Sequence, residues 1–193
     1  MKIRRNNILL GAVILLLTPG LSGQEWNYAR LSLIYGGEIP FYFNSVKRIS
    51  EGMEIQEGTI LGITLVDSAQ VGHTLTGFDL QMRAFNGATE IMGEVHSLEL
   101  NRIRISADNY LGFGAGFSTD GYQDLSAAWT RLCQYTDPDL VFDDLAWDTH
   151  QLGISYECGK PVSEGGNGSL LGEPADFYRV EIEIELIPTG PGF

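Results

Sequence analysis

Strict alternation of apolar and polar residues is the feature of this sequence that most restricts its fold. In the stretch DFYRVEIEIELIP (176–188), every second residue from Tyr178 to Leu186 is apolar, and arginine or glutamate stands between them. Successive side chains of a β-strand point to opposite faces of a sheet, whereas a helix needs apolar positions three and four residues apart. This segment is therefore predicted to be a long strand with one face in a core and the other in water.

The same period of two recurs along most of the chain. It predicts six further strands, each followed or preceded by turn-forming residues, at 29–35, 38–46, 58–68, 77–87, 98–109 and 150–158. Residues 124–136 instead place their apolar side chains at helical spacing, which predicts one short helix there, with another strand as the alternative. Many short strands favour an all-β fold, an antiparallel β-sandwich of the immunoglobulin or pilin type. A closed barrel is the competing architecture.

The first 23 residues are typical of a secretory signal peptide. A basic start at residues 2–5 is followed by an apolar run at 8–17, a Thr-Pro-Gly breaker at 18–20 and small residues up to the predicted cut. The apolar run is shorter than the roughly 20 residues that span a bilayer, and an uncleaved anchor helix is the alternative. We expect a secreted, single mature domain of residues 24–193 with no membrane insertion after signal removal.

The mature chain is strongly acidic. The whole chain has a formal net charge of −13, and removal of residues 1–23, with three positive charges and no negative one, takes it to −16. Such a chain is repelled by phosphate backbones and by anionic membranes, which argues against nucleic acid as a partner.

The two cysteines, Cys133 and Cys158, predict one disulfide, because an even number of cysteines in an exported protein is normally paired. Closing a loop of about 25 residues would stabilise the fold by about 3 kcal/mol. A catalytic thiol with His150 as its base is the alternative, but no nucleophile motif surrounds either cysteine.

The acidic residues form no recognisable catalytic or metal-binding pattern, and the sequence predicts neither an enzyme nor a cofactor. Glu181, Glu183 and Glu185 share one strand face and are interpreted as a solvated surface, since glycosidase carboxylates face each other across a cleft. An acidic loop offers oxygen ligands for calcium, but its spacing departs from the twelve-residue calcium loop. These calcium candidates are Asp137, Asp139, Asp143 and Asp144.

Three further features suggest contacts with sugars. Ser68 lies in Asp-Ser-Ala, which looks like an O-glycosylation site of exported bacterial proteins, and Asn167 begins an Asn-Gly-Ser sequon for N-glycosylation. Trp26, Trp129 and Trp147 are either a sugar-stacking platform or core residues.

Two stretches carry a resemblance to a known group of proteins. IPFYFNSVKRISEGM (39–53) and the end of the chain, from HQLGISYECG (150–159) to the strand that follows Pro174, Asp176 and Tyr178, resemble small exported β-sandwich proteins of bacterial envelopes. Some of these are related to pilus or fimbrial subunits. The resemblance implies a sandwich at a Gram-negative cell surface and brings no catalytic residue with it.

The leading functional expectation is an extracellular structural subunit that assembles into a homo-oligomer or filament. Residues 24–37 would be a donor-strand arm that completes a neighbour's sheet, with Gly36-Gly37 as its joint. The arm residues are Trp26, Tyr28, Leu31, Leu33 and Tyr35. Pairing of this strand within its own domain is the alternative. The second expected function is a binding module for a surface glycan or a protein.

Overall fold

The computed structural model describes residues 27–67, 75–137 and 145–190, and most of its regular structure consists of antiparallel strands. A five-stranded sheet, sheet A, has the order β1-β2-β10-β6-β8. Its strands are β1 (Asn27–Tyr35), β2 (Met53–Asp67), β10 (Gln151–Cys158), β6 (Ile103–Leu111) and β8 (Gln123–Asp124). Their neighbours along the sheet pair antiparallel throughout.

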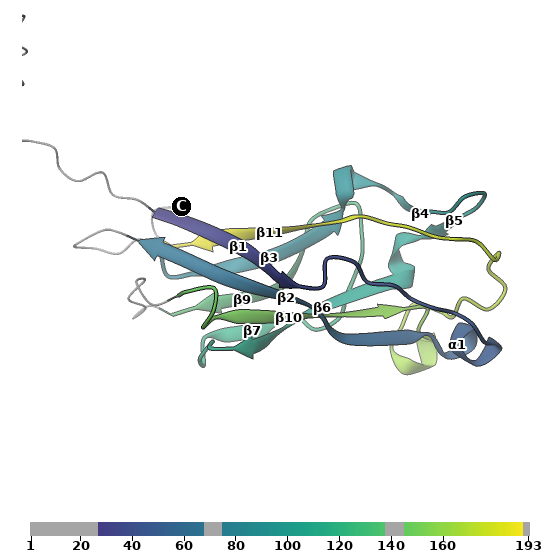
Figure 1. Ribbon diagram of the computed structural model, residues 1–193, viewed down its shortest axis with the longest axis horizontal. Coiled ribbons are helices and arrows are strands. Elements are labelled where there is room, and N and C mark those ends of the chain that lie inside the picture. Colours follow the sequence, from purple (N-terminus) through teal and green to yellow (C-terminus); the bar gives the residue numbers. More distant parts are fainter. Residues whose placement is uncertain (1–26, 68–74, 138–144, 191–193) are drawn as a thin grey trace, which may run out of the picture.

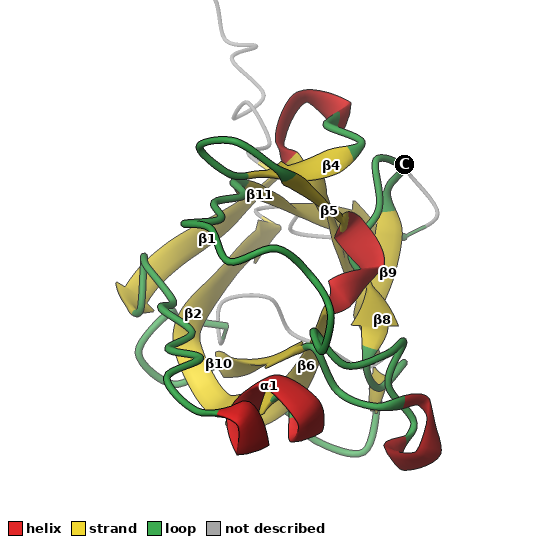
Figure 2. Cartoon of the chain, turned by 90° about the vertical axis from the view of Figure 1, so that its right-hand side faces the viewer, coloured by secondary structure: helices red, strands yellow, loops and turns green. Residues whose placement is uncertain are grey.

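A four-stranded sheet, sheet B, has the order β11-β3-β9-β7. Its strands are β11 (Ile182–Thr189), β3 (Gly77–Ala84), β9 (Thr130–Thr136) and β7 (Phe117–Thr119). A separate hairpin joins β4 (Glu90–Met92) to β5 (Ser97–Glu99). Viewed along the long axis, β1, β2, β10 and β6 lie on one side of the domain and β11 and β9 on the other (Figure 2).

Helical structure is confined to short pieces. Among the described residues the α-helix is α1 (Val46–Glu51), which begins where the Ser45 side chain accepts a hydrogen bond from the Arg48 N–H. The 3₁₀ turns are η1 (Phe85–Gly87), η2 (Leu100–Arg102) and η4 (Val162–Glu164). Figure 1 shows α1 and the β4–β5 hairpin at one end of the elongated molecule, with the start of β1 and the end of β11 at the other.

A single hydrophobic cluster takes its side chains from both sheets. The predicted inward residues of β3, Phe78, Leu80 and Met82, are almost fully buried, and their polar neighbours alternate to the outside. Sheet A contributes Ile63 and Leu65 of β2 and the alternate residues of β6 and β10. Burying each such side chain contributes about 1.5–3 kcal/mol, so the alternation that the sequence displays is also what stabilises the fold.

The positions of several predicted elements were wrong. Residues 130–136 form β9 and not a helix, because they pair with β3 and β7 and bury Leu132 and Tyr135. Residues 38–45 form no strand, although Ile39, Phe41 and Phe43 pack partly against the core. Pro40 has no N–H to donate within this segment. The predicted strand 98–109 is divided by η2 into β5 and β6.

The predicted disulfide is contradicted, because Cys133 and Cys158 are both free and buried. Cys133 lies in β9 between Leu80 and Thr119 of sheet B, whereas Cys158 ends β10 in sheet A. β9 and β10 belong to different sheets, and each thiol fills a place in the apolar cluster. The cysteines therefore act as small core residues.

Candidate functional site

The outer face of sheet A carries a polar groove. Side chains alternate along a strand, so Ile105, Ala107 and Ile154 point into the core while Ser106, Asp108 and Ser155 point away from it. The groove has a volume of about 350 Å³ and runs across β2, β10 and β6. Its lining offers three carboxylates, one amide and three hydroxyl groups, from Glu54, Gln56, Glu57, Ser106, Asp108, Tyr122 and Ser155.

A bulge in β2 shapes the floor of this groove. The pairing of β2 with β10 shifts between Ile154 and Tyr156, so that residues 56–58 stand opposite the single residue Ser155. Glu57 takes a left-handed φ of 50°, which is uncommon for a residue with a side chain, and its N–H donates to Ser155 Oγ at 3.0 Å. A Cβ added at Gly153 would lie 3.1 Å from Glu57 Cγ, so the Glu57 side chain lies directly against the glycine.

Hydrogen bonds fix the end of the groove near β8. Tyr122 Oη and Gln56 Nε2 both donate to Glu54 Oε1, at 3.1 and 3.0 Å. The bond from Gln56 is the main cause of a lowered pKa at Glu54, and burial followed by the Glu54 charge raises the pKa of Tyr122 to about 12. At neutral pH, Glu54 is therefore ionised and Tyr122 keeps its proton, so donor and acceptor are set before any ligand arrives.

The middle of the groove is rich in hydrogen-bond acceptors. Ser106 Oγ donates weakly to Asp108 Oδ2 at 3.4 Å, and Ser155 Oγ already accepts the Glu57 N–H. Ser155 itself is 7% exposed. Among the described residues, no lysine or arginine forms an ion pair with Glu57 or Asp108. The site therefore presents two carboxylates without a cationic partner beside the Ser155 hydroxyl.

Aromatic side chains border the other end of the groove. Tyr110 lies two residues beyond Asp108 on the outer face of β6, is 49% exposed, and has its ring beside Gly153. Trp147 is 51% exposed, and a Cβ added at Gly62 would lie 2.5 Å from its backbone O and 2.9 Å from its Cβ. Gly153 therefore leaves room for the Tyr110 ring, and Gly62 leaves room for the backbone of Trp147.

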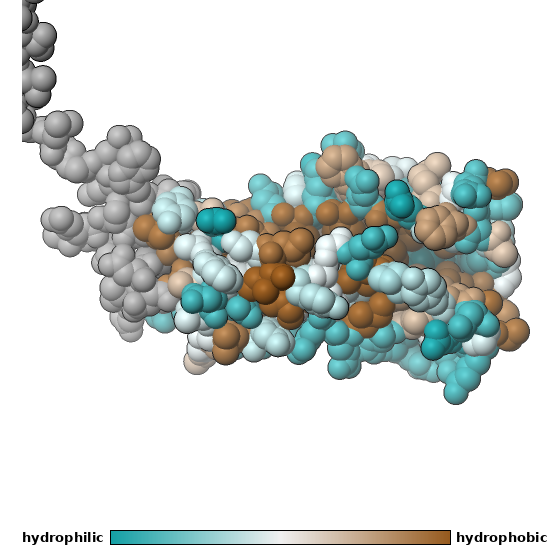
Figure 3. Space-filling model, in the orientation of Figure 1, coloured by the Kyte–Doolittle hydropathy of each residue, from teal (hydrophilic) through white to brown (hydrophobic). Residues whose placement is uncertain are grey.

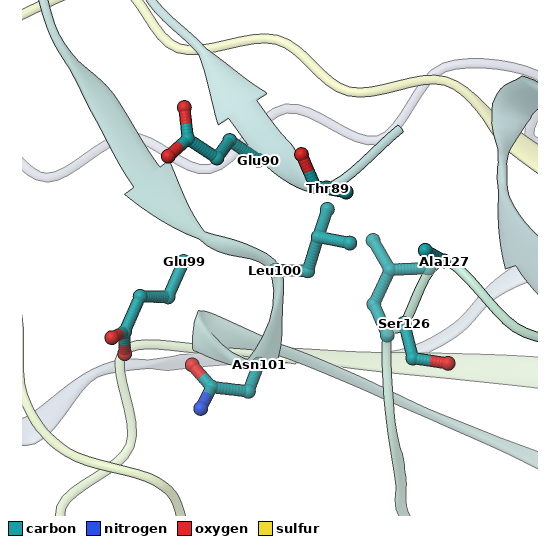
Figure 4. A pocket seen from close by; sticks show the side chains of 8 residues that line it. Thr89, Glu90, Glu99, Leu100, Asn101, Ser126 and Ala127 are labelled. Carbon is teal, nitrogen blue, oxygen red and sulfur yellow. The ribbon is translucent and has the colours of Figure 1, made fainter. Parts of the chain in front are cut away.

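A second hollow, of about 390 Å³, lies beside the β4–β5 hairpin. In Figure 4 Leu100 occupies its centre between Thr89 and Ala127, while the carboxylates of Glu90 and Glu99 point away from it. The two glutamates are cross-strand partners, which places like charges opposite each other. The hollow has few groups directed inward, and we regard the groove on sheet A as the candidate site.

The glutamate row of β11 lies on the outer face of sheet B. Glu183 pairs with Arg83, and Glu185 accepts a hydrogen bond of 2.9 Å from Gln81 Nε2. Arg83 also stacks on Trp129, with its Cζ 4.4 Å from the ring centroid. Glu183 is thus paired with a cation and Glu185 with an amide, and the row takes no part in the groove.

The predicted arm is paired within its own domain. β1 pairs with β2 in register from Asn27 to Tyr35, with one irregularity, and Gly36 O accepts a bond of 2.6 Å from Thr59 Oγ1. Leu31 packs partly against the core, while Tyr28, Leu33 and Tyr35 are at least half exposed. Hydrophobic side chains are visible over the end of β1 in Figure 3. Trp26 lies outside the described residues.

The predicted calcium ligands and the two cysteines are not brought together into a site among the described residues. Within the described part of the chain, no three His, Cys, Asp or Glu side chains are placed to hold a metal ion. Asp137 follows β9 and accepts a bond from Tyr135 Oη at 3.3 Å, whereas Asp139, Asp143 and Asp144 lie outside the described residues. Burial raises the pKa of both cysteines, that of Cys158 to about 12, which disfavours the nucleophilic thiolate.

The glycosylation candidates stay predictions. Ser68 lies outside the described residues. Asn167 is partly buried, and its Nδ2 donates to Asn101 O at 3.2 Å and to Asp124 Oδ1. A sugar on Nδ2 would have to replace at least one of these bonds.

Sequence reasoning missed the residues of the groove. A signal was present, because the alternation of MEIQ (53–56) breaks at Glu57-Gly58, where two polar residues precede a glycine. A glycine that interrupts a strand pattern indicates a bulge. The other groove residues, Ser106, Asp108 and Ser155, are ordinary outward residues that only the pairing of β6 with β10 brings together.

Comparisons with family models and with curated protein sequences gave no match. In the part of the chain that the structure describes, no helix is long and apolar enough to cross a membrane.

Proposed function

We propose that the protein is an exported, non-catalytic binding module that holds a glycan in the groove on the outer face of sheet A. The observation that carries this proposal is the combination of hydrogen-bonding side chains and an exposed tyrosine on one rigid sheet. Sugars present hydroxyl groups at their edges and C–H groups on their faces. Carboxylates accept from the hydroxyls through charge-assisted bonds, and an aromatic ring packs against the C–H face.

The scaffold that we propose for this site is a β-sandwich of the immunoglobulin or pilin type. The hydrophobic cluster that the two sheets share supports it, as do their separate hydrogen-bonded strand orders. In such a scaffold the outer face of a sheet is rigid. Side chains placed on it therefore lose little freedom when they bind a ligand.

Retention on immobilised polysaccharides tests the proposal. The mature protein should be retained by at least one glycan, and Glu57→Gln and Tyr110→Ala should each reduce retention. Glu185→Gln is the matched control, because Glu185 lies on the outer face of sheet B. Equal retention of all three variants would rule out the groove as the site.

A second candidate function is the structural subunit that assembles through β1. It is supported by the place of β1 at the edge of sheet A and by its exposed apolar residues, of which Leu33 and Tyr35 are 60% and 67% exposed. An edge strand of this kind offers unpaired backbone groups to a second copy. Electron microscopy and light scattering of the mature protein test it. Ordered fibres would support assembly, and a monomer at all concentrations would contradict it.

A further inference from the structure

We infer that the groove binds an internal segment of a polysaccharide that carries no negative charge. This inference rests on the glycan-binding function proposed above and narrows its ligand. Three properties of the site lead to it: its length, the positions of its tyrosines and the sign of its charge.

The groove is long compared with a single sugar ring. On β6 it is lined by Ser106 and Asp108, and Tyr110 borders it beside Gly153. The four residues of strand from Ser106 to Tyr110 extend for about 13 Å at about 3.3 Å each. Two or three linked sugar rings fit along this distance, which favours a chain over a monosaccharide.

The ends of the groove favour a chain that passes through it. Tyr122 borders one end, and Tyr110, which is 49% exposed, borders the other. Aromatic rings at both borders suit a ligand that extends in both directions, whereas capture of a chain end would need a wall of polar groups at one border.

The charge of the groove excludes anionic glycans. Glu54, Glu57 and Asp108 contribute three carboxylates. Lys160 Nζ lies 3.8 Å from Glu54 Oε2 but also binds Glu157, a buried residue outside the groove lining. Arg104, which packs over the Tyr122 ring, is itself paired with Asp124 and Glu157. Like charges repel at this range, so uronate or sulfate groups would be disfavoured. Uncharged sugar hydroxyls are donors, and they match the carboxylate oxygens of Glu57 and Asp108, of which Asp108 Oδ2 accepts only the weak bond from Ser106.

Affinity electrophoresis of the mature protein provides the first test. Gels would contain uncharged polysaccharides (β-glucan, xylan, mannan and α-glucan) or anionic ones (polygalacturonate and alginate). We expect retardation by at least one uncharged polymer and by neither anionic polymer. Retardation by an anionic polymer would overturn the inference and leave the glycan-binding function intact. No retardation in any gel would overturn both.

Calorimetry with oligosaccharides of the retained polymer provides the second test. Affinity should rise at least about tenfold between the disaccharide and the hexasaccharide, and blocking the reducing end should change nothing. Tyr110→Ala should lower hexasaccharide affinity about tenfold and disaccharide affinity less. The matched control is Tyr42→Ala, because Tyr42 is exposed and does not line the groove. Equal affinity for both lengths, or loss of binding on end-blocking, would show that a chain end is bound.

Discussion

The backbone N–H of Glu57 donates a hydrogen bond to Ser155 Oγ at 3.0 Å, joining residues that are 98 positions apart in the chain. This bond holds the bulge of β2 against β10 and keeps Glu57 in the left-handed region. The carboxylate is thereby placed over Gly153, beside Asp108 on the neighbouring strand. Strained residues that a surrounding structure holds in place are often found at functional sites.

The stability of Glu57 variants should depend on how well the new residue accepts a positive φ. Asparagine visits the left-handed region readily, whereas a β-branched side chain is strongly disfavoured there. Glu57→Asn should change the free energy of unfolding by less than about 0.5 kcal/mol, and Glu57→Val should lower it by about 1–2 kcal/mol. Urea unfolding measures both. Equal stability of the two variants would contradict the left-handed conformation.

The carboxylate of Asp176 should make the fold sensitive to acid. It accepts backbone N–H bonds from Glu94, Val95 and His96 at 3.1, 2.8 and 2.8 Å, which ties the β4–β5 turn to the segment before β11. These bonds, led by the one from Val95, hold the pKa of Asp176 well below its usual range. Since the pKa is lower in the folded state, the stabilisation is complete above the unfolded pKa of about 3.9 and is lost as pH falls below it.

Thermal unfolding of Asp176→Asn tests this linkage. The variant should unfold at a lower temperature than the parent at neutral pH, and the difference should shrink as the pH falls below about 4. Asp148→Asn is the control, because Asp148 is exposed in the turn before β10. A constant difference between parent and Asp176→Asn from pH 7 to pH 2 would contradict the role of the charge.

Alternating segments could be predicted well from the sequence, because burial of one strand face leaves a pattern within the segment itself. β1, β3 and β10 were predicted to within three residues at each end, whereas β11 begins only at Ile182, although the alternation starts at Tyr178. β9 could not be predicted, since its apolar residues also fit a helix and the pairing with β3 decides between the two. Local periodicity carries no information about which strand becomes a neighbour.

The candidate site depends on such non-local pairing, which explains why it escaped prediction. Ser106 faces Ser155 only because β6 and β10 pair in one register, and Glu57 joins them only through the bulge. The disulfide prediction failed for a similar reason. An even number of cysteines does not reveal which sheet each one joins, and Cys133 and Cys158 belong to different sheets.

Thiol chemistry should report two buried, unpaired cysteines. Neither Cys133 nor Cys158 should react with a thiol reagent in the folded protein, because both are buried and burial raises their pKa. Two thiols should react after denaturation without a reducing agent, and a reducing agent should leave the unfolding temperature unchanged. Mass spectrometry after alkylation counts the thiols. If no thiol reacts in the denatured, unreduced protein, Cys133 and Cys158 are joined in a disulfide after all.

The joint after β1 should be intolerant of a side chain. Gly36 has a φ of 78°, and a Cβ there would lie 1.8 Å from Gly58 O, a backbone atom that cannot move aside cheaply. Gly36→Ala should therefore lower the free energy of unfolding by about 2 kcal/mol or more, through both strain and the clash. Gly37→Ala is the matched control, since its nearest neighbour would be Leu33 Cδ2 at 3.4 Å, an ordinary contact.

The same pair of variants distinguishes a fixed β1 from an exchanged one. With β1 docked in its own sheet, as Thr59 Oγ1 bonding to Gly36 O implies, Gly36→Ala is destabilising and Gly37→Ala is nearly neutral. An arm that leaves its domain at this joint would lose the close approach to Gly58. Urea unfolding at two protein concentrations separates these cases: equal, small effects of both substitutions would show that β1 does not remain where the structure places it.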